Sequence, residues 1–197
     1  MASHHQLTAR AKNEVLAWLR SRGARPGEIV EFGWLQLRVC GTPSALDVET
    51  LDFQAMASFT TDLSQALHVH QRQMDLLREA GVESERCTLR HAGLVSQGYV
   101  PGQAGTFLTR LGPAKRSDSG WVIGTVAERL TKNSLKSSRF ISLYEISLAD
   151  PRLLSFWLLP SYYTVVLHAD SHELIPPHTD IPFIDDFGQV KPWWKFW

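Results

Sequence analysis

The segment Lys115-Arg116-Ser117-Asp118-Ser119-Gly120-Trp121-Val122-Ile123-Gly124 gives the strongest local signal about the fold. A polar run ends at Asp-Ser-Gly, and Trp121 then opens a short apolar segment that Gly124 closes. Asp and Ser side chains can bond to their own backbone, and Gly permits a positive φ. Residues Asp118, Ser119, Gly120 and Trp121 therefore predict a tight structural turn that leads into a buried strand.

Periodic patterns on both sides of this turn predict helices and strands. Apolar residues recur at helical spacing in residues 8–22 and in a second helix that Thr61-Asp62 caps and Gly81 ends. Residues 28–39 alternate between apolar and polar, which predicts a strand or a hairpin turned at Gly33. We expect further extended segments at residues 52–59, 85–95, 106–110 and 162–168, and helices that start at Ser142 and Pro151.

Together these patterns predict an α+β fold with an antiparallel sheet and flanking helices. We expect an N-terminal helix–strand–helix portion over residues 1–84, an α+β domain over 85–170, and an irregular tail over 171–197 that packs on the body. Pro176, Pro177, Pro182 and Pro192 disfavour regular structure in the tail. Its last residues, Lys191-Pro192-Trp193-Trp194-Lys195-Phe196-Trp197, are rich in aromatic side chains that either cover the core or anchor a partner.

The composition is typical of a globular protein rather than of a membrane or nucleic-acid-binding protein. The chain of 197 residues is 44% hydrophobic and 20% charged, and its 20 Lys and Arg balance its 20 Asp and Glu. No apolar run approaches the roughly 18 residues of a membrane helix, and the first residues lack the apolar core of a signal peptide. Cys40 and Cys87 are the only cysteines, which fits a reducing compartment. We therefore expect a cytoplasmic protein that binds neither membranes nor nucleic acid.

The net charge of zero conceals acidic and basic stretches. Residues 28–62 contain six acids and a single base, Arg38, whereas residues 110–139 contain seven bases and two acids. A second acidic stretch contains Asp170, Glu173, Asp180, Asp185 and Asp186, with no Lys or Arg between its ends. Such stretches are either solvated faces or a polarised surface that orients a charged partner.

No arrangement of polar residues gives a strong catalytic or metal-binding signal. His168-Ala169-Asp170 and His178-Thr179-Asp180 each have the spacing of two metal ligands on a strand, but no later histidine completes an iron-binding triad. Ser119 lies in Asp-Ser-Gly rather than in a nucleophile elbow. Cys87 and His91 lie four residues apart, which is too far along a strand for a hydrogen bond. We therefore expect no catalytic residue, no metal and no cofactor.

Several short motifs follow one another in an order that resembles a known family. They are Asp118-Ser119-Gly120-Trp121, the apolar pair Val122-Ile123, the polar loop 131–138, Ser142-Leu143-Tyr144-Glu145 and Leu158-Leu159-Pro160. In this order they resemble the small immunity domains of bacterial polymorphic toxin systems, the immunity-33-like group. The resemblance covers residues 88–168. It implies a cognate antitoxin, similar to proteins encoded beside type VI secretion effectors, which binds one secreted toxin and blocks it without turnover.

An antitoxin acts where its toxin acts, so a cytoplasmic antitoxin implies a toxin with a cytosolic target. This favours a nuclease or an NAD-consuming enzyme over a cell-wall hydrolase, and we expect a nuclease. Nucleases present basic clefts, which favours acidic contacts on the antitoxin. The expected partner-binding residues are Glu28, Glu31, Asp47, Glu49, Asp52, Asp180, Asp185, Asp186, Trp193 and Trp194. Two alternatives stay open: a metal-dependent or hydrolytic enzyme that uses dispersed His, Asp and Cys residues, and an adaptor or chaperone for a secreted effector.

Overall fold

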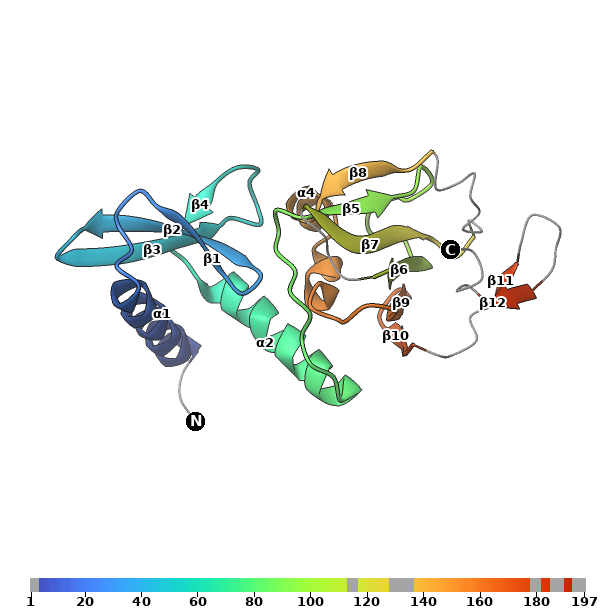
Figure 1. The fold of residues 1–197 in the computed structure, drawn as a ribbon, viewed down its shortest axis with the longest axis horizontal. Helices are drawn as coiled ribbons and strands as arrows, with labels where there is room; N and C mark the ends of the chain where they lie inside the picture. The colour runs from blue at the N-terminus through green and yellow to red at the C-terminus, as the bar shows by residue number, and fades with distance from the viewer. Residues whose placement is uncertain (1–3, 113–116, 128–136, 178–181, 185–189, 193–197) are drawn as a thin grey trace.

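The structure, a computed structural model, describes residues 4–112, 117–127, 137–177, 182–184 and 190–192. It has the expected α+β architecture, with two main sheets that lie side by side in an elongated molecule (Figure 1). The smaller sheet contains β1 (Ile29–Phe32), β2 (Leu35–Thr42), β3 (Ala45–Leu51) and β4 (Phe59–Thr60), in that spatial order. Helix α1 (His4–Ser21) precedes this sheet in the chain and α2 (Ser64–Ala80) follows it.

The larger sheet is mixed rather than purely antiparallel as expected. Its spatial order is β10-β9-β6-β7-β5-β8, and β5 and β7 run parallel while the other neighbours run antiparallel. The cause is β6, which lies between β5 and β7 in the chain but pairs on the far side of β7. The strands are β5 (Ala92–Val95), β6 (Thr106–Arg110), β7 (Asp118–Thr125), β8 (Arg139–Ser142), β9 (Thr164–Leu167) and β10 (His172–Ile175).

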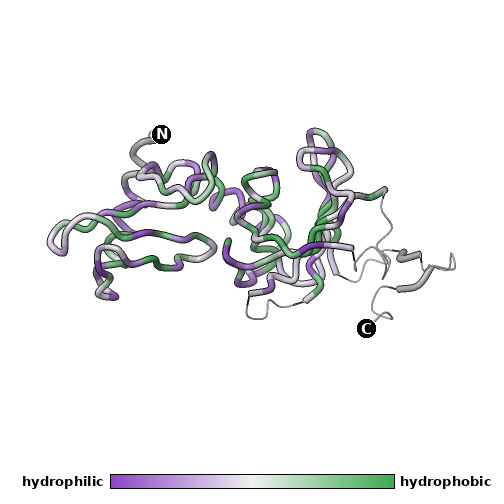
Figure 2. Tube along the Cα trace, turned by 90° about the horizontal axis from the view of Figure 1, so that it is seen from above, coloured by the Kyte–Doolittle hydropathy of each residue, from purple (hydrophilic) through white to green (hydrophobic). Residues whose placement is uncertain are grey.

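In the smaller sheet, alternation along the sequence predicts the strands better than it predicts their ends. The expected hairpin is present: β1 and β2 pair antiparallel across a turn in which Gly33 has a φ of 59°. In β3, Leu46 and Val48 are buried while Asp47 and Glu49 lie on the other face. Figure 2 shows the same alternation of hydrophilic and hydrophobic colour along these strands. The extended segment expected at residues 52–59 is wrong, because β3 ends at Leu51 and a loop precedes the short β4.

The segment 85–95, expected to be one strand, is a strand only over Ala92–Val95. Cys87, Thr88 and Leu89 are buried consecutively, so their side chains do not alternate between two faces as they would in a strand. The backbone bonds here go to other parts of the fold, because Glu85 N donates to Leu158 O (3.0 Å) and Leu89 N donates to Trp34 O (3.3 Å).

Local end signals place the helices well. α2 ends where Gly81 adopts the left-handed conformation, with a φ of 66°. α4 (Leu143–Ala149) begins with a capping box, in which the Ser142 side chain accepts from Glu145 N and the Glu145 side chain accepts from Ser142 N. The segment expected to start at Pro151 is the 3-10 helix η1 (Pro151–Phe156). α1 begins at His4, four residues before the expected start.

The described part of the tail after residue 170 contains short strands. β10 pairs with β9 and extends the larger sheet, and β11 (Pro182–Ile184) pairs with β12 (Val190–Pro192). Pro182 and Pro192 lie opposite each other at the end of the β11–β12 pair, where a missing N–H is tolerated. The aromatic residues Trp193, Trp194, Phe196 and Trp197 lie outside the described residues.

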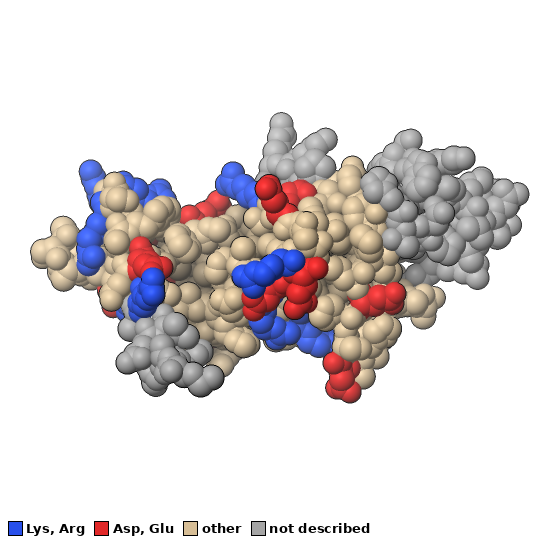
Figure 3. Space-filling model, turned by 90° about the horizontal axis from the view of Figure 1, so that it is seen from below, with Lys and Arg blue, Asp and Glu red and all other residues tan. Residues whose placement is uncertain are grey.

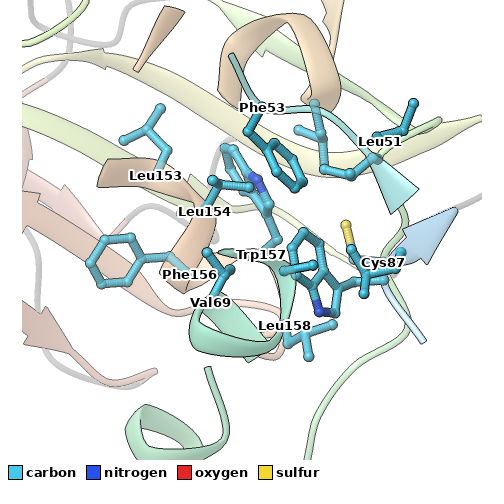
Figure 4. Packing of buried hydrophobic residues seen from close by; sticks show 14 of the residues in the cluster. Leu51, Phe53, Val69, Cys87, Leu153, Leu154, Phe156, Trp157 and Leu158 are labelled. Carbon is cyan, nitrogen blue, oxygen red and sulfur yellow. The ribbon is translucent and has the colours of Figure 1, made fainter. Parts of the chain in front are cut away.

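One continuous cluster of buried apolar residues joins the two sheets. Figure 4 shows side chains from both halves of the chain meeting in it, among them Phe53, Val69 and Trp157. Polar links cross the same boundary, because Gln73 Nε2 of α2 donates to the carbonyl of Leu154 in η1 at 2.6 Å. None of the helices in the described ranges combines the length and the apolar composition that crossing a membrane requires.

The side chain of Arg110, at the end of β6 in the larger sheet, is fully buried. Its Nε donates to the carbonyl of Ser119 (3.1 Å), Nη1 to that of Leu159 (2.6 Å) and Nη2 to that of Arg86 (3.1 Å). Nη2 also lies 3.2 Å from Glu85 Oε1, as an ion pair without hydrogen-bond geometry. Arg110 thus binds three separate parts of the chain: β7, the residues just after η1, and the segment between α2 and β5.

Residues Asp118–Trp121 lie at the start of β7, in a bulge rather than in a reversal between two strands. Ala92 of β5 lies opposite Asp118 of β7, but Leu94, two residues later, lies opposite Val122, four residues later. The additional residues on β7 form the bulge. Asp118 Oδ1 accepts from Gly120 N at 2.8 Å, and Gly120 has a φ of 76°. Ser119 Oγ donates to the Ala92 carbonyl at 2.7 Å, so the bulge fastens β7 to β5.

Replacement of Gly120 by Ala should destabilise the protein. A Cβ at this position would collide with the Gly112 carbonyl oxygen, in addition to the cost of a positive φ. We expect a loss of about 1–3 kcal/mol in the free energy of unfolding, measured by urea titration. Gly102→Ala is the matched control, because Gly102 has a φ of 83° and an added Cβ meets nothing within 4 Å. Equal losses in the two variants would show that the collision with Gly112 is unimportant.

Removal of the carboxylate beside Arg110 should be more costly than removal of an exposed one. Glu85→Ala leaves a buried guanidinium without a counter-ion, so we expect a loss of about 3–5 kcal/mol in urea unfolding. Glu31→Ala removes the exposed ion pair with Arg86 and should cost about 0–1 kcal/mol. A loss for Glu85→Ala as small as that for Glu31→Ala would mean that the three backbone carbonyls satisfy Arg110 by themselves.

Candidate partner-binding surface

The acidic residues expected near the N-terminus as partner contacts are occupied within the protein. Four of them form ion pairs and the fifth accepts a backbone hydrogen bond. The pairs are Arg22–Glu28 (3.9 Å), Arg86–Glu31 (3.0 Å), Lys12–Asp47 (2.7 Å) and Arg38–Glu49 (2.6 Å from Nε), and Asp52 Oδ1 accepts from Gln54 N (2.8 Å).

Most of the bases in these pairs come from outside the acidic stretch. Lys12 and Arg22 belong to α1 and its C-terminal end, and Arg86 follows α2. The hydrogen bond from Lys12 holds the pKa of Asp47 below its ordinary value. Figure 3 shows acidic and basic side chains next to one another on the face that it draws. The fold therefore offsets the negative charge that the sequence concentrates at residues 28–62, and the electrostatic argument for this stretch as a partner-facing side becomes weaker.

The remaining expected contacts are outside the described residues. These are Asp180, Asp185, Asp186, Trp193 and Trp194. Of the second acidic stretch, Asp170 and Glu173 are described, and both are exposed beside the β9–β10 turn.

Candidate metal ligands do not converge in the described part of the chain. His168 and Asp170 follow β9 as exposed residues, while His178 and Asp180 are not described. Among the described residues, no group of three His, Cys, Asp or Glu side chains is arranged to hold a metal ion.

The Cys87 thiol is poorly suited to act as a nucleophile. Burial raises the pKa of Cys87 to about 12, so almost none of it is thiolate near neutral pH. His91 Nδ1 instead accepts from Thr88 N at 3.5 Å, and burial lowers the pKa of His91. An open depression of about 420 Å³ borders the C-terminal end of α2, but Cys87 and His91 are not part of its lining, which is Met74, Leu77, Arg78, Val82, Glu83 and Ser84.

The buried carboxylate of Asp150 is fully engaged in holding a loop. Its Oδ2 accepts from Tyr99 OH (3.0 Å), Gly102 N (2.9 Å) and Arg152 Nη2 (2.7 Å), and its Oδ1 accepts from Arg152 Nε (2.8 Å). Burial by itself would raise the pKa of Asp150, but the hydrogen bonds from Arg152, Gly102 and Tyr99 outweigh it and hold the pKa below its ordinary value. These contacts fasten the loop between β5 and β6 to the start of η1.

An exposed aromatic side chain lies on an open edge of the larger sheet. Phe140, in the edge strand β8, is 66% exposed, whereas Phe53, Phe107 and Phe156 are buried. β8 pairs with β5 through Leu94↔Phe140 and Gly93↔Ile141, and no described strand pairs with its other side. Phe140 is one of seven large hydrophobic side chains exposed among the described residues, and it lies on an edge strand, whose unpaired backbone groups can pair with another chain.

Sequence reasoning did not identify Phe140 as a candidate contact residue. β8 is four residues long and follows a polar loop, so its apolar pair Phe140-Ile141 gives too short a run for a strand prediction. The available signal was the Ser142–Glu145 capping box that follows, because an N-cap residue has an extended backbone, as Ser142 does.

Comparisons with protein-family models, with curated proteins and with solved structures find no significant match to this chain. The resemblance to immunity domains therefore stays a prediction that depends on the motifs in residues 88–168.

Acid should destabilise the protein in part through Asp150. A carboxyl whose pKa is lower in the folded than in the unfolded state stabilises above the unfolded pKa of about 4, and this contribution disappears as the pH falls through the folded pKa. The urea midpoint of the wild type should therefore fall more steeply than that of Asp150→Asn between about pH 5 and about pH 3. Parallel curves for the two proteins would contradict the lowered pKa of Asp150.

Proposed function

We propose that this protein is an immunity protein that binds one secreted bacterial toxin in equimolar amount and blocks its action in the cytosol. It acts by occupying a surface of the toxin and not by turnover. A nuclease is the toxin class that we propose first. The proposal combines the resemblance of residues 88–168 to immunity domains with the distribution of apolar and polar groups in the fold.

Two of the motifs that carry the resemblance, Asp118–Trp121 and Leu158–Pro160, lie close together in the fold, although they are far apart in the sequence. The Trp121 ring packs against the Trp157 ring with centroids 5.7 Å apart. The carbonyl of Leu159, next to Pro160, accepts from Arg110, which also binds the carbonyl of Ser119. This supports the idea that the motifs mark one structural unit, as the signature of a domain family does.

The observation that carries the proposal is the exposure of Phe140 on the unpaired edge of β8. Several conspicuous polar groups of the fold are engaged elsewhere: Arg110 and Asp150 are buried in internal hydrogen bonds, and the acids of residues 28–49 form ion pairs. Exposed apolar surface together with internally satisfied charges favours binding to another macromolecule over chemistry on a small substrate.

The proposal is tested by recovery of the partner and by protection from it. The full chain, tagged and expressed in a secretion-competent bacterial host, should retain one protein in equimolar amount that carries a toxin domain. When that protein is produced in the cytosol of sensitive cells, growth should stop, and co-expression of this chain should restore it. Loss of nucleic acid before rescue would identify the toxin as a nuclease.

Three results would contradict this function. A partner whose toxicity is unaffected, but whose secretion requires this chain, would indicate an adaptor or chaperone. A preparation without a partner that contains about one equivalent of zinc or iron would favour a metal-dependent enzyme, for which tetrahedral or facial ligand sets are the norm. A retained partner that lacks toxicity of its own would also remove the antitoxin assignment.

A further inference from the structure

We propose that β8 accepts an extended, acidic segment of the partner protein as an added strand of the larger sheet, with Phe140 at the centre of the contact. The identity of the partner as a toxin rests on the proposed function. The binding mode itself rests on the backbone, the side chains and the charges of the edge, which follow in turn.

The backbone of Phe140 faces away from β5. Leu143 N donates to the His91 carbonyl at 2.8 Å, so His91 and Leu143, one step beyond Ala92↔Ser142, form a hydrogen-bonded pair. Hydrogen-bonded and non-bonded pairs alternate in an antiparallel ladder, so Ala92↔Ser142 and Leu94↔Phe140 are non-bonded pairs. Their N–H and C=O groups point outward. The Ser142 N–H reaches Glu145 Oε2 at 3.4 Å, so Phe140 carries the outward pair that an incoming strand can use.

The side chain of Phe140 offers an anchor on one face of that strand. Phe140 lies opposite the half-buried Leu94, so an added strand would place a side chain beside the Phe140 ring on the same face. An apolar residue at that position would cover the exposed ring. Main-chain bonds and one apolar contact together are the means by which peptide-binding sheets hold an extended segment.

The charges around β8 select an acidic segment. Arg139, the first residue of β8, is exposed, and so is Arg90, which precedes β5 at the other end of the pair. Neither forms an ion pair with a described residue. The nearby carboxylate of Glu145 is engaged by Ser142 N and Oγ. An Asp or Glu in the added strand opposite Arg139 would complete the pairing.

A second copy of this chain fits the edge less well than a different protein. If two β8 strands paired antiparallel about Phe140, each Arg139 would face Ile141, and if they paired in parallel, Arg139 would face Arg139. Neither arrangement supplies a carboxylate.

The edge also lacks the proline that commonly prevents pairing of exposed strands, and its single charge is Arg139.

Three variants separate the contributions to binding. Phe140→Ala removes the ring and keeps the backbone. Phe140→Pro also removes the outward N–H, which the fold does not use, so it should fold while blocking an added strand. Arg139→Glu reverses the charge. Ile29→Ala is the matched control, because Ile29 is 53% exposed on β1, the edge strand of the smaller sheet. Thermal unfolding verifies that each variant is folded.

Two probes are used, so that this proposal can fail independently of the proposed function. One is the protein retained in the pull-down, and the other is a displayed library of random peptides selected on the wild-type chain. We expect selected peptides to combine an acidic with an apolar residue. Binding should weaken by at least about tenfold in Phe140→Ala and further in Phe140→Pro, with no change in Ile29→Ala. Arg139→Glu should slow association of acidic ligands. Hydrogen exchange of the Phe140 amide should slow on binding.

The outcomes are distinct. Binding of both probes that is unchanged in the Phe140 variants, or unchanged amide exchange at Phe140, overturns the added strand. A wild-type dimer in solution that Phe140→Pro dissociates assigns the edge to a second copy and overturns the proposed occupant. Selected peptides that bind at Phe140 in the absence of any retained toxin support the edge and contradict the antitoxin function. If Phe140→Pro does not fold, Phe140→Ala, Arg139→Glu and the amide exchange decide.

Discussion

The part of the protein around the larger sheet depends on the charge of Arg110, which has no access to water. The Arg110 guanidinium must find partners inside the protein, because an unpaired buried cation is far too costly for a marginally stable fold. Its partners are carbonyls from three separate segments and the carboxylate of Glu85, whose other oxygen accepts from Ser161 N and Oγ. Each segment can lie in only one place if Arg110 is to be satisfied. The bulge at Asp118–Trp121, the end of the η1 region and the start of the β5 segment are therefore positioned together.

This constraint also explains why Ser119, which the sequence analysis weighed as a nucleophile, is structural in the fold. Ser119 supplies its carbonyl to Arg110 and its hydroxyl to β5. Asp150 is enclosed by Tyr99, Gly102 and Arg152. Among the side chains that this framework leaves exposed is the aromatic ring of Phe140, on a short strand edge. The candidate contact surface is thus attached to a rigid support, since β8 leads directly into the capped helix α4.

Features that depend on neighbouring residues were predictable, and those that depend on distant ones were not. Gly81, Ser142 and Pro151 mark helix ends through local backbone chemistry, and the structure has helix ends at all three. The parallel pairing of β5 with β7 and the addition of β10 arise from long-range pairing that no local pattern encodes. The acids at residues 28–52 appeared unopposed because Lys12, Arg22 and Arg86 come from other segments. β8 was missed because four residues contain too little periodicity, so the candidate contact at Phe140 emerged only from the fold.

The core that joins the two sheets has a consequence for synthesis of the chain on the ribosome. Val69 of α2 and Phe53, which follows β3, belong to the same apolar cluster as Leu154 of η1, which begins about 70 residues after α2 ends. At about 5–20 residues per second, the first half waits roughly 4–14 s with part of its apolar surface uncovered. During that interval the nascent chain exposes apolar surface of the kind that chaperones bind.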